Sequence, residues 1–217
     1  MKFNFFLLIS FVLLSGCKKD KGPDQTVKYL PADIKAYGYF KSGSWWVYEE
    51  MTSHDLDSVY LYSSVDTIIT FDGSTGTKAG TYESIEMYAH SFFDEYNYNI
   101  WANTTWPTIG GKRALNRVKF KAGDYEGKTI TFFDKLALND YMTTGLVNGV
   151  VKLVDFKDSM PINNNTFYGV RKFYDTRNPN EQLSPTHFYY AKNVGLIRKE
   201  VIWQNKVWNL VRYHIIQ

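Results

Sequence analysis

Cysteine is nearly absent from this sequence, because the 217 residues hold only one, Cys17. A single thiol excludes any disulfide within one chain. The apolar segment Phe3–Leu14 falls short of the about 20 residues that a transmembrane helix needs. Neither sign of charge is in large excess, since 25 basic side chains stand against 22 acidic ones. The charge balance therefore gives no reason to expect a nucleic-acid partner.

Local motifs of catalysis and cofactor binding are also lacking. The glycine-rich stretches GSTGTK and GGKR do not have the spacing of a phosphate-binding loop. No Gly-x-Ser-x-Gly elbow is present, which argues against an α/β-hydrolase. The four histidines (His54, His90, His187 and His214) are too far apart for local zinc-ligand spacing. We therefore predict neither a metal nor a cofactor, and we name no catalytic residue.

The segment around the lone cysteine predicts how the protein is attached. Lys2 and the apolar run Phe3–Leu14 have the form of a secretory signal peptide. Leu14, Ser15, Gly16 and Cys17 then match the bacterial lipobox, in which small residues admit the signal peptidase and the thiol accepts a diacylglycerol. We expect cleavage before Cys17 and lipidation of its thiol, which anchors the chain by about 0.8 kcal/mol per buried methylene.

Three regions are expected along the chain. Residues 1–16 form the signal peptide, residues 17–27 form the lipidated cysteine and a polar tether, and residues 28–217 form one β-rich domain. The tether (KKDKGPDQTV after Cys17) is too polar to bury a core of its own. The expected location is the outer membrane, with the domain facing the periplasm or the cell surface.

The composition of the chain and the spacing of its turn residues favour a mainly β fold. Aromatic residues make up 18% of the chain, and they occur with Val, Ile and Thr in short runs separated by turns rich in Gly and Asn. Short loops predict antiparallel pairing, because parallel neighbours need long crossovers. Besides these strands we expect at most one or two short helices, the best candidate being Asp134–Met142. The expected strands are Tyr37–Phe40, Ser44–Met51, Ser58–Tyr62, Thr67–Phe71, Thr81–His90, Tyr96–Ala102, Ala114–Lys121, Lys128–Phe133, Val150–Phe156, Thr166–Tyr174, His187–Ala191, Gly195–Trp203 and Val207–Ile216.

Two stretches carry a resemblance to known proteins. YFKSGSWWVYEE (Tyr39–Glu50) and YYAKNVGLIRKE (Tyr189–Glu200) resemble the opening and closing strands of uncharacterised small lipoproteins of Gram-negative bacteria. The resemblance implies an envelope protein with a curved antiparallel sheet, half-barrel or sandwich-like in shape. It brings no activity with it.

The leading functional hypothesis is a non-enzymatic, lipid-anchored binding or accessory module. Its partners would be the membrane, through the N-terminal lipid, and an envelope protein complex, a glycan or an apolar ligand. One alternative is a carrier that holds apolar molecules on the concave face of the sheet. The other is a hydrolase of envelope polysaccharide, with Glu49, Glu50, Glu83 or Glu86 among its acids.

The stretch VIWQNKVWNL (Val201–Leu210) predicts a hairpin centred on Asn205-Lys206, since Asn accepts positive φ. That register sets Trp203 opposite Trp208 and Val201 opposite Leu210. A turn at Gln204-Asn205 is the alternative. The tryptophan pair has two open roles, a sugar-stacking platform for ligand binding or sheet packing, and the energetics of paired aromatics favour packing.

Overall fold

A computed structural model describes residues 26–29, 32–72, 79–91, 94–102, 112–120, 129–133, 141–143, 150–175 and 186–217. Helix α1 spans Ala32–Gly38 and a single turn of 3-10 helix, η1, spans Ile202–Gln204. The strands are β1 (Val27–Lys28), β2 (Trp45–Glu50), β3 (Leu56–Phe71), β4 (Gly80–Ser91), β5 (Asp94–Ala102), β6 (Lys112–Phe120), β7 (Thr129–Phe133), β8 (Tyr141–Thr143), β9 (Val150–Ile162), β10 (Asn165–Asp175), β11 (Thr186–Ala191), β12 (Gly195–Val201) and β13 (Lys206–His214).

One sheet contains all thirteen of these strands, in two meanders. The first runs from β7 back through β6, β5, β4 and β3 to β2, and the second runs from β13 through β12, β11, β10 and β9 to β8. The two meanders are joined where β2 pairs with β13. All pairs are antiparallel except that of β1 with β4. The prediction of a mainly β fold with one curved antiparallel sheet is confirmed, and the single layer is a half-barrel, not a sandwich.

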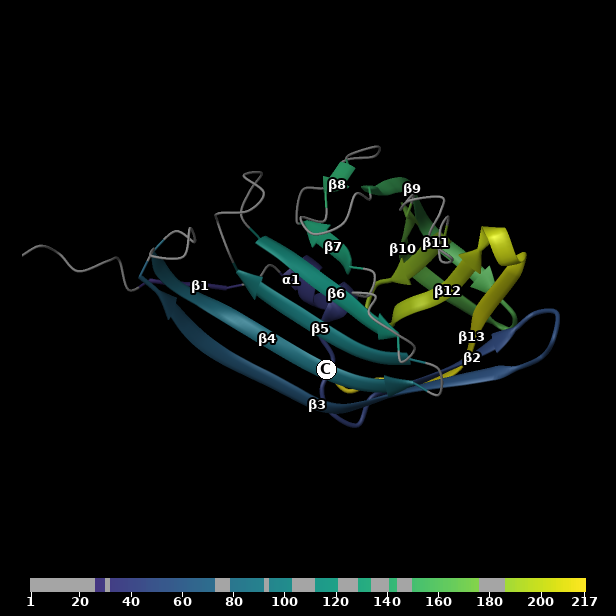
Figure 1. Ribbon diagram of the computed structural model, residues 1–217, viewed down its shortest axis with the longest axis horizontal. Coiled ribbons are helices and arrows are strands. Elements are labelled where there is room, and N and C mark those ends of the chain that lie inside the picture. The colour runs from purple at the N-terminus through teal and green to yellow at the C-terminus, as the bar shows by residue number, and fades with distance from the viewer. Residues whose placement is uncertain are drawn as a thin grey trace, which may run out of the picture.

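Helix α1 lies on the concave side of the curved sheet, and we call this side the inner face. Figure 1 shows the helix between the long strands β3–β6 and the group β9–β13, and it packs against β6 and β12. The Tyr37 hydroxyl donates to the carbonyl of Gly169 on β10 at 2.6 Å, and Arg171 lies 4.4 Å from the Tyr37 ring. The amide of Asn193 donates to the carbonyl of Ala36 at 2.6 Å. The helix thus ties the second meander to the first.

Aromatic side chains form much of the inner core beside the helix. The rings of Phe40 and Trp46 meet edge to face at 5.1 Å. The Trp46 indole donates to the carbonyl of Val194 at 2.8 Å, and the Tyr48 hydroxyl donates to that of Leu196 at 2.9 Å. Buried Tyr and Trp need such partners for their polar atoms. Strand β2 therefore contributes every second residue to the core, as its alternating burial shows.

Two sequence predictions about the N-terminal third of the chain are wrong. A strand was expected at Tyr37–Phe40, but Tyr37 and Gly38 belong to α1. Ser58–Tyr62 and Thr67–Phe71 were expected as separate strands, but both lie in the single strand β3. The pairing of β3 with β4 shifts by one residue between Leu61 and Ser63. This bulge reverses the apolar alternation, which hides the continuity of the strand in the sequence.

The remaining expected strands each overlap an observed one, although the ends differ. The expected helix Asp134–Met142 is not supported, because Tyr141 and Met142 lie in β8 and residues 134–140 fall outside the described part. Three described turns contain an asparagine with positive φ, namely Asn163, Asn193 and Asn205. These residues tolerate left-handed backbone better than other types.

Gly195 provides the first test of this packing. Its φ of +86° disfavours any side chain, and a Cβ there would lie 3.1 Å from the Phe40 ring. We expect Gly195→Ala to lower the free energy of unfolding by about 2–4 kcal/mol, from backbone strain and overpacking together. Asn193→Gly in the same turn is the matched control and should change it by less than about 0.5 kcal/mol. Equal unfolding midpoints for the two variants in urea would contradict this account.

Candidate functional site

Charged and hydrogen-bonding side chains gather on the outer face, the side of the sheet opposite α1. On β11 and β12 the register places Tyr189 opposite Arg198 and His187 opposite Glu200. Lys172 on β10 is the register partner of Tyr189 on its other side. Since alternate residues of a strand point the same way, these side chains share one face. We call His187, Tyr189, Arg198 and Glu200 the Glu200 cluster.

Glu200 is the acceptor at the centre of this cluster. One carboxylate oxygen, Oε2, accepts from the Tyr189 hydroxyl at 3.0 Å and lies 3.0 Å from His187 Nδ1. The other, Oε1, accepts from Arg198 Nε and Nη2, both at 2.8 Å. Both oxygens are therefore engaged by donors from β11 and β12, which holds the two strands together through side chains as well as backbone.

The surroundings set the charge state of each member. Partial burial alone would raise the pKa of Glu200, but the hydrogen bonds from His187 and Tyr189 and the charge of Arg198 outweigh it, and the pKa is lowered. Burial, with help from Lys172, lowers the pKa of His187 despite the opposing effect of Glu200. Burial and the negative charge of Glu200 raise the pKa of Tyr189. At neutral pH the cluster thus holds an ionised carboxylate, a neutral imidazole and a protonated phenol.

This arrangement holds β11 and β12 together through side chains. A neutral imidazole with Nδ1–H toward a carboxylate resembles the pair that orients a catalytic or metal-binding histidine. Both oxygens of Glu200 already accept from protein donors, so the carboxylate itself is not free to act as a general base. Among the described residues no group of three His, Cys, Asp or Glu side chains could hold a metal ion.

A second charged group lies on the inner face, at the N-terminal helix. Lys35 of α1 forms an ion pair with the buried carboxylate of Glu83 on β4. Burial raises the pKa of Asp66 on β3, and the negative charge of Glu83 adds to this effect while Lys35 opposes it. Burial likewise raises the pKa of Tyr39, with a contribution from Asp66. Asp66 and Glu83 are diagonal neighbours in the register of β3 and β4, so they form a pair of carboxylates on the inner face.

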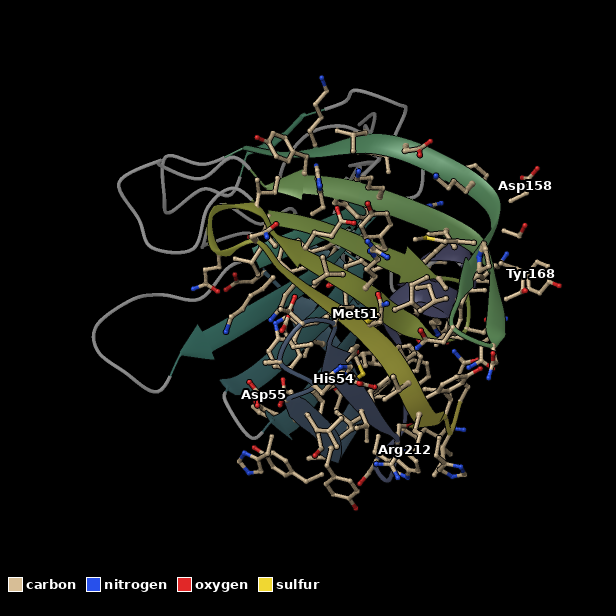
Figure 2. All side chains as sticks on the ribbon, turned by 90° about the vertical axis from the view of Figure 1, so that its right-hand side faces the viewer. Met51, His54, Asp55, Asp158, Tyr168 and Arg212 are labelled. Carbon is tan, nitrogen blue, oxygen red and sulfur yellow. The ribbon has the colours of Figure 1, made fainter. Side chains whose placement is uncertain are left out.

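The other acids named for a hydrolase are placed apart. Glu49 lies on the outer face beside His54 in the β2–β3 turn, and Figure 2 shows His54 on that turn. Glu50 is buried on the opposite side of β2. Backbone hydrogen bonding, first of all from Ser53, lowers the pKa of Glu50 to about 2, so this residue holds the turn. Glu86 lies on β4 opposite Val65, three residues beyond Glu83.

The structure corrects the predicted hairpin between β12 and β13. Val201 pairs with Lys206 and Lys199 pairs with Trp208, so Trp203 is not opposite Trp208 and Val201 is not opposite Leu210. Trp203 lies in η1, and Asn205 ends that turn at φ +50°. Because the 3-10 turn η1 takes the place of the expected two-residue loop, every residue pair between β12 and β13 differs from the predicted register. Trp208 instead has Lys199 Nζ 5.7 Å from its ring centre. The ligand-binding role predicted for Trp203 and Trp208 stays a prediction.

The lipidation residues cannot be compared with the structure. Leu14, Ser15, Gly16 and Cys17 fall outside the described residues. In the described part, neither helix has the length and apolarity needed to cross a bilayer.

Sequence reasoning missed a row of rings on the outer face. His90 on β4 pairs with Tyr60 on β3, Tyr60 pairs with Trp45 on β2, and Trp45 pairs with His214 on β13. We call these four residues the outer aromatic row. Because successive residues of a strand point to opposite faces, Trp45 and Trp46 lie on different sides of β2. Only the register of the sheet brings Tyr60, His90 and His214 into one row with Trp45.

Tyr62, the residue at the β3 bulge, enlarges the row. Its ring stacks on that of His90 at 4.3 Å and lies 6.2 Å from that of Tyr88. At the other end, the rings of Trp45 and His214 stack at 6.3 Å. Tyr60 and Tyr62 are 50% and 41% exposed, and His90 and His214 are also exposed. Exposed rings gathered on one face are a candidate interaction surface.

Comparison with protein-family models, curated proteins and solved structures found no match to this chain.

The Glu200 cluster makes a prediction about pH. We expect Glu200→Gln to lower the free energy of unfolding by about 1–3 kcal/mol at pH 7, because Arg198 loses its ion pair. A lowered pKa in the folded state gives stability above the ordinary value of 4.5 that is lost on acidification. The difference between wild type and variant should therefore narrow as the pH falls below about 4.5.

Urea unfolding from pH 3 to pH 8 measures this difference. Glu49→Gln is the matched control, because its partner His54 is largely exposed and such pairs contribute little. A Glu200→Gln effect that does not change with pH, or that equals the effect of Glu49→Gln, would show that the cluster does not stabilise the fold through charge.

Proposed function

We propose that this protein is a lipid-anchored envelope lipoprotein that acts as a non-enzymatic binding or accessory module. The observation that carries the proposal is the outer aromatic row, an exposed surface on the face of the sheet that α1 does not occupy. The lipobox at Leu14–Cys17 supports attachment to the outer membrane. The domain would face the periplasm or the cell surface.

The tether is compatible with such a role. The ten residues of the expected tether, Lys18 to Val27, would reach at most about 33–36 Å if fully extended, at 3.3–3.6 Å per residue. This reach lets a lipid-anchored domain turn its outer face toward a partner in the envelope. Attachment to a surface also raises the local concentration of the module near that partner.

Each alternative depends on the inner face. A carrier of apolar molecules needs space on the concave side, where α1, Phe40 and Trp46 pack in the described part of the chain. A polysaccharide hydrolase needs two free carboxyl groups, and Asp66 with Glu83 is the pair that favours it, although Lys35 holds Glu83. A screen of envelope polysaccharides with Glu83→Gln as the control tests the hydrolase. Co-purifying lipid in native mass spectrometry tests the carrier.

Lipidation has a direct test. Cys17→Ser should abolish labelling by a palmitate analogue and leave the signal peptide uncleaved at this site, because a hydroxyl does not accept the diacylglycerol. Ser15→Ala keeps a small residue in the lipobox and should be labelled and cleaved like the wild type. In-gel fluorescence and intact mass report both events. A Cys17→Ser chain that is still acylated would refute the proposed anchor.

Binding is tested with the purified full-length lipidated chain in detergent micelles. The labelled protein should bind isolated envelope fractions saturably, and an excess of unlabelled protein should displace it. Binding that rises linearly with concentration and resists competition would contradict a specific binding module.

A further inference from the structure

The outer aromatic row runs across the strands and not along one of them. Neighbouring strands lie about 4.7–4.9 Å apart, so four strands carry the row over about 14 Å. Its members come from segments that are distant in the chain, since Trp45 and His214 are brought together by the pairing of β2 with β13. A ligand lying perpendicular to the strands would meet a ring at each step.

Polar side chains flank the row on the same face. Two positions along each strand, the register sets Ser58 opposite Val47 and Val47 opposite Arg212. Ser58 and Arg212 are both exposed, and Figure 2 shows Arg212 near the end of β13. A hydroxyl and a guanidinium therefore lie beside the rings, where they can form hydrogen bonds with a ligand that stacks on them.

The chemistry of this surface fits a sugar better than a lipid headgroup or a charged peptide. Tyrosine, tryptophan and histidine rings each have an apolar face and a polar edge, as does a pyranose with its C–H face and equatorial hydroxyls. The four residues of the row include no carboxylate and no lysine. Anionic lipid surfaces are instead recognised by clusters of lysine and arginine. A row of rings without carboxylate or lysine fits an uncharged ligand that stacks on them, such as a neutral glycan.

We propose that the outer aromatic row, extended by Tyr62, binds a neutral carbohydrate chain laid across β4, β3, β2 and β13. This inference rests on the proposed binding function and gives its ligand class. The contacts are stacking of sugar rings on Tyr60, Tyr62 and Trp45, with Ser58 and Arg212 as donors to hydroxyl groups. The site lies away from Trp203 and Trp208.

The experiment is affinity electrophoresis of the full-length protein in detergent through gels that contain dextran, xylan or mannan. At least one polysaccharide should retard the wild type. Tyr60→Ala and Tyr62→Ala should each raise the dissociation constant at least tenfold. Tyr168→Ala is the matched control, because Tyr168 is 67% exposed on β10, outside the row. Unchanged melting temperatures of the three variants show that folding is intact.

Several results would overturn the inference. Absence of retardation by every polysaccharide would do so, and so would equal loss of binding in the Tyr168→Ala control. Vesicles of phosphatidylethanolamine and phosphatidylglycerol that bind wild type but not Tyr60→Ala would assign the row to a bilayer. A wild-type dimer that Tyr60→Ala converts to a monomer would assign it to a second copy of the chain.

The glycan inference and the binding function fail in different ways. Saturable envelope binding that Tyr60→Ala abolishes, without retardation by any polysaccharide, would reject the ligand class and keep the binding function. A wild type that binds neither envelope fractions nor polysaccharide would reject both.

Discussion

The pairing of β2 with β13 is the constraint on which the rest of the structure depends. It joins two meanders whose other strands pair only with sequence neighbours, apart from β1. Side chains on the inner face reinforce this junction. Trp46 and Tyr48 of β2 donate hydrogen bonds to the backbone carbonyls of Val194 and Leu196. The same junction places Trp45 beside His214 on the outer face. The curved sheet and the row of rings therefore both depend on one long-range pairing.

The two faces of the sheet differ in what their side chains contact. On the inner face α1 packs beside the aromatic core, and the polar atoms of Tyr37 and Trp46 donate to backbone carbonyls. The outer face has two parts. The Glu200 cluster pairs its own charges across β11 and β12, whereas in the outer aromatic row Tyr60, His90 and His214 are exposed and Trp45 is half-buried. A surface with satisfied charges at one end and exposed rings at the other is suited to binding through the rings.

Much of the strand content was predictable because aromatic and branched residues alternate between turns of Gly and Asn. The expected strand Ser44–Met51 contains β2, and Asn205 has the expected positive φ. Three features were hidden. The bulge at Tyr62 reverses the alternation within β3, the seven residues of α1 are too few to show a helical period, and η1 shifts the last hairpin. The outer aromatic row needs three correct registers at once, one of them long-range, which local patterns do not contain.

The most direct test of the central claim is an NMR titration of the uniformly labelled full-length chain in micelles with the polysaccharide that retards it most. The account predicts shifts of the Trp45 indole and of the His90 and His214 imidazoles, with saturation at one common dissociation constant. The signals of Trp46 and His187, on the inner face and in the Glu200 cluster, should stay in place. Shifts confined to Trp46, His187 or Trp208, with the outer aromatic row unmoved, would contradict the account.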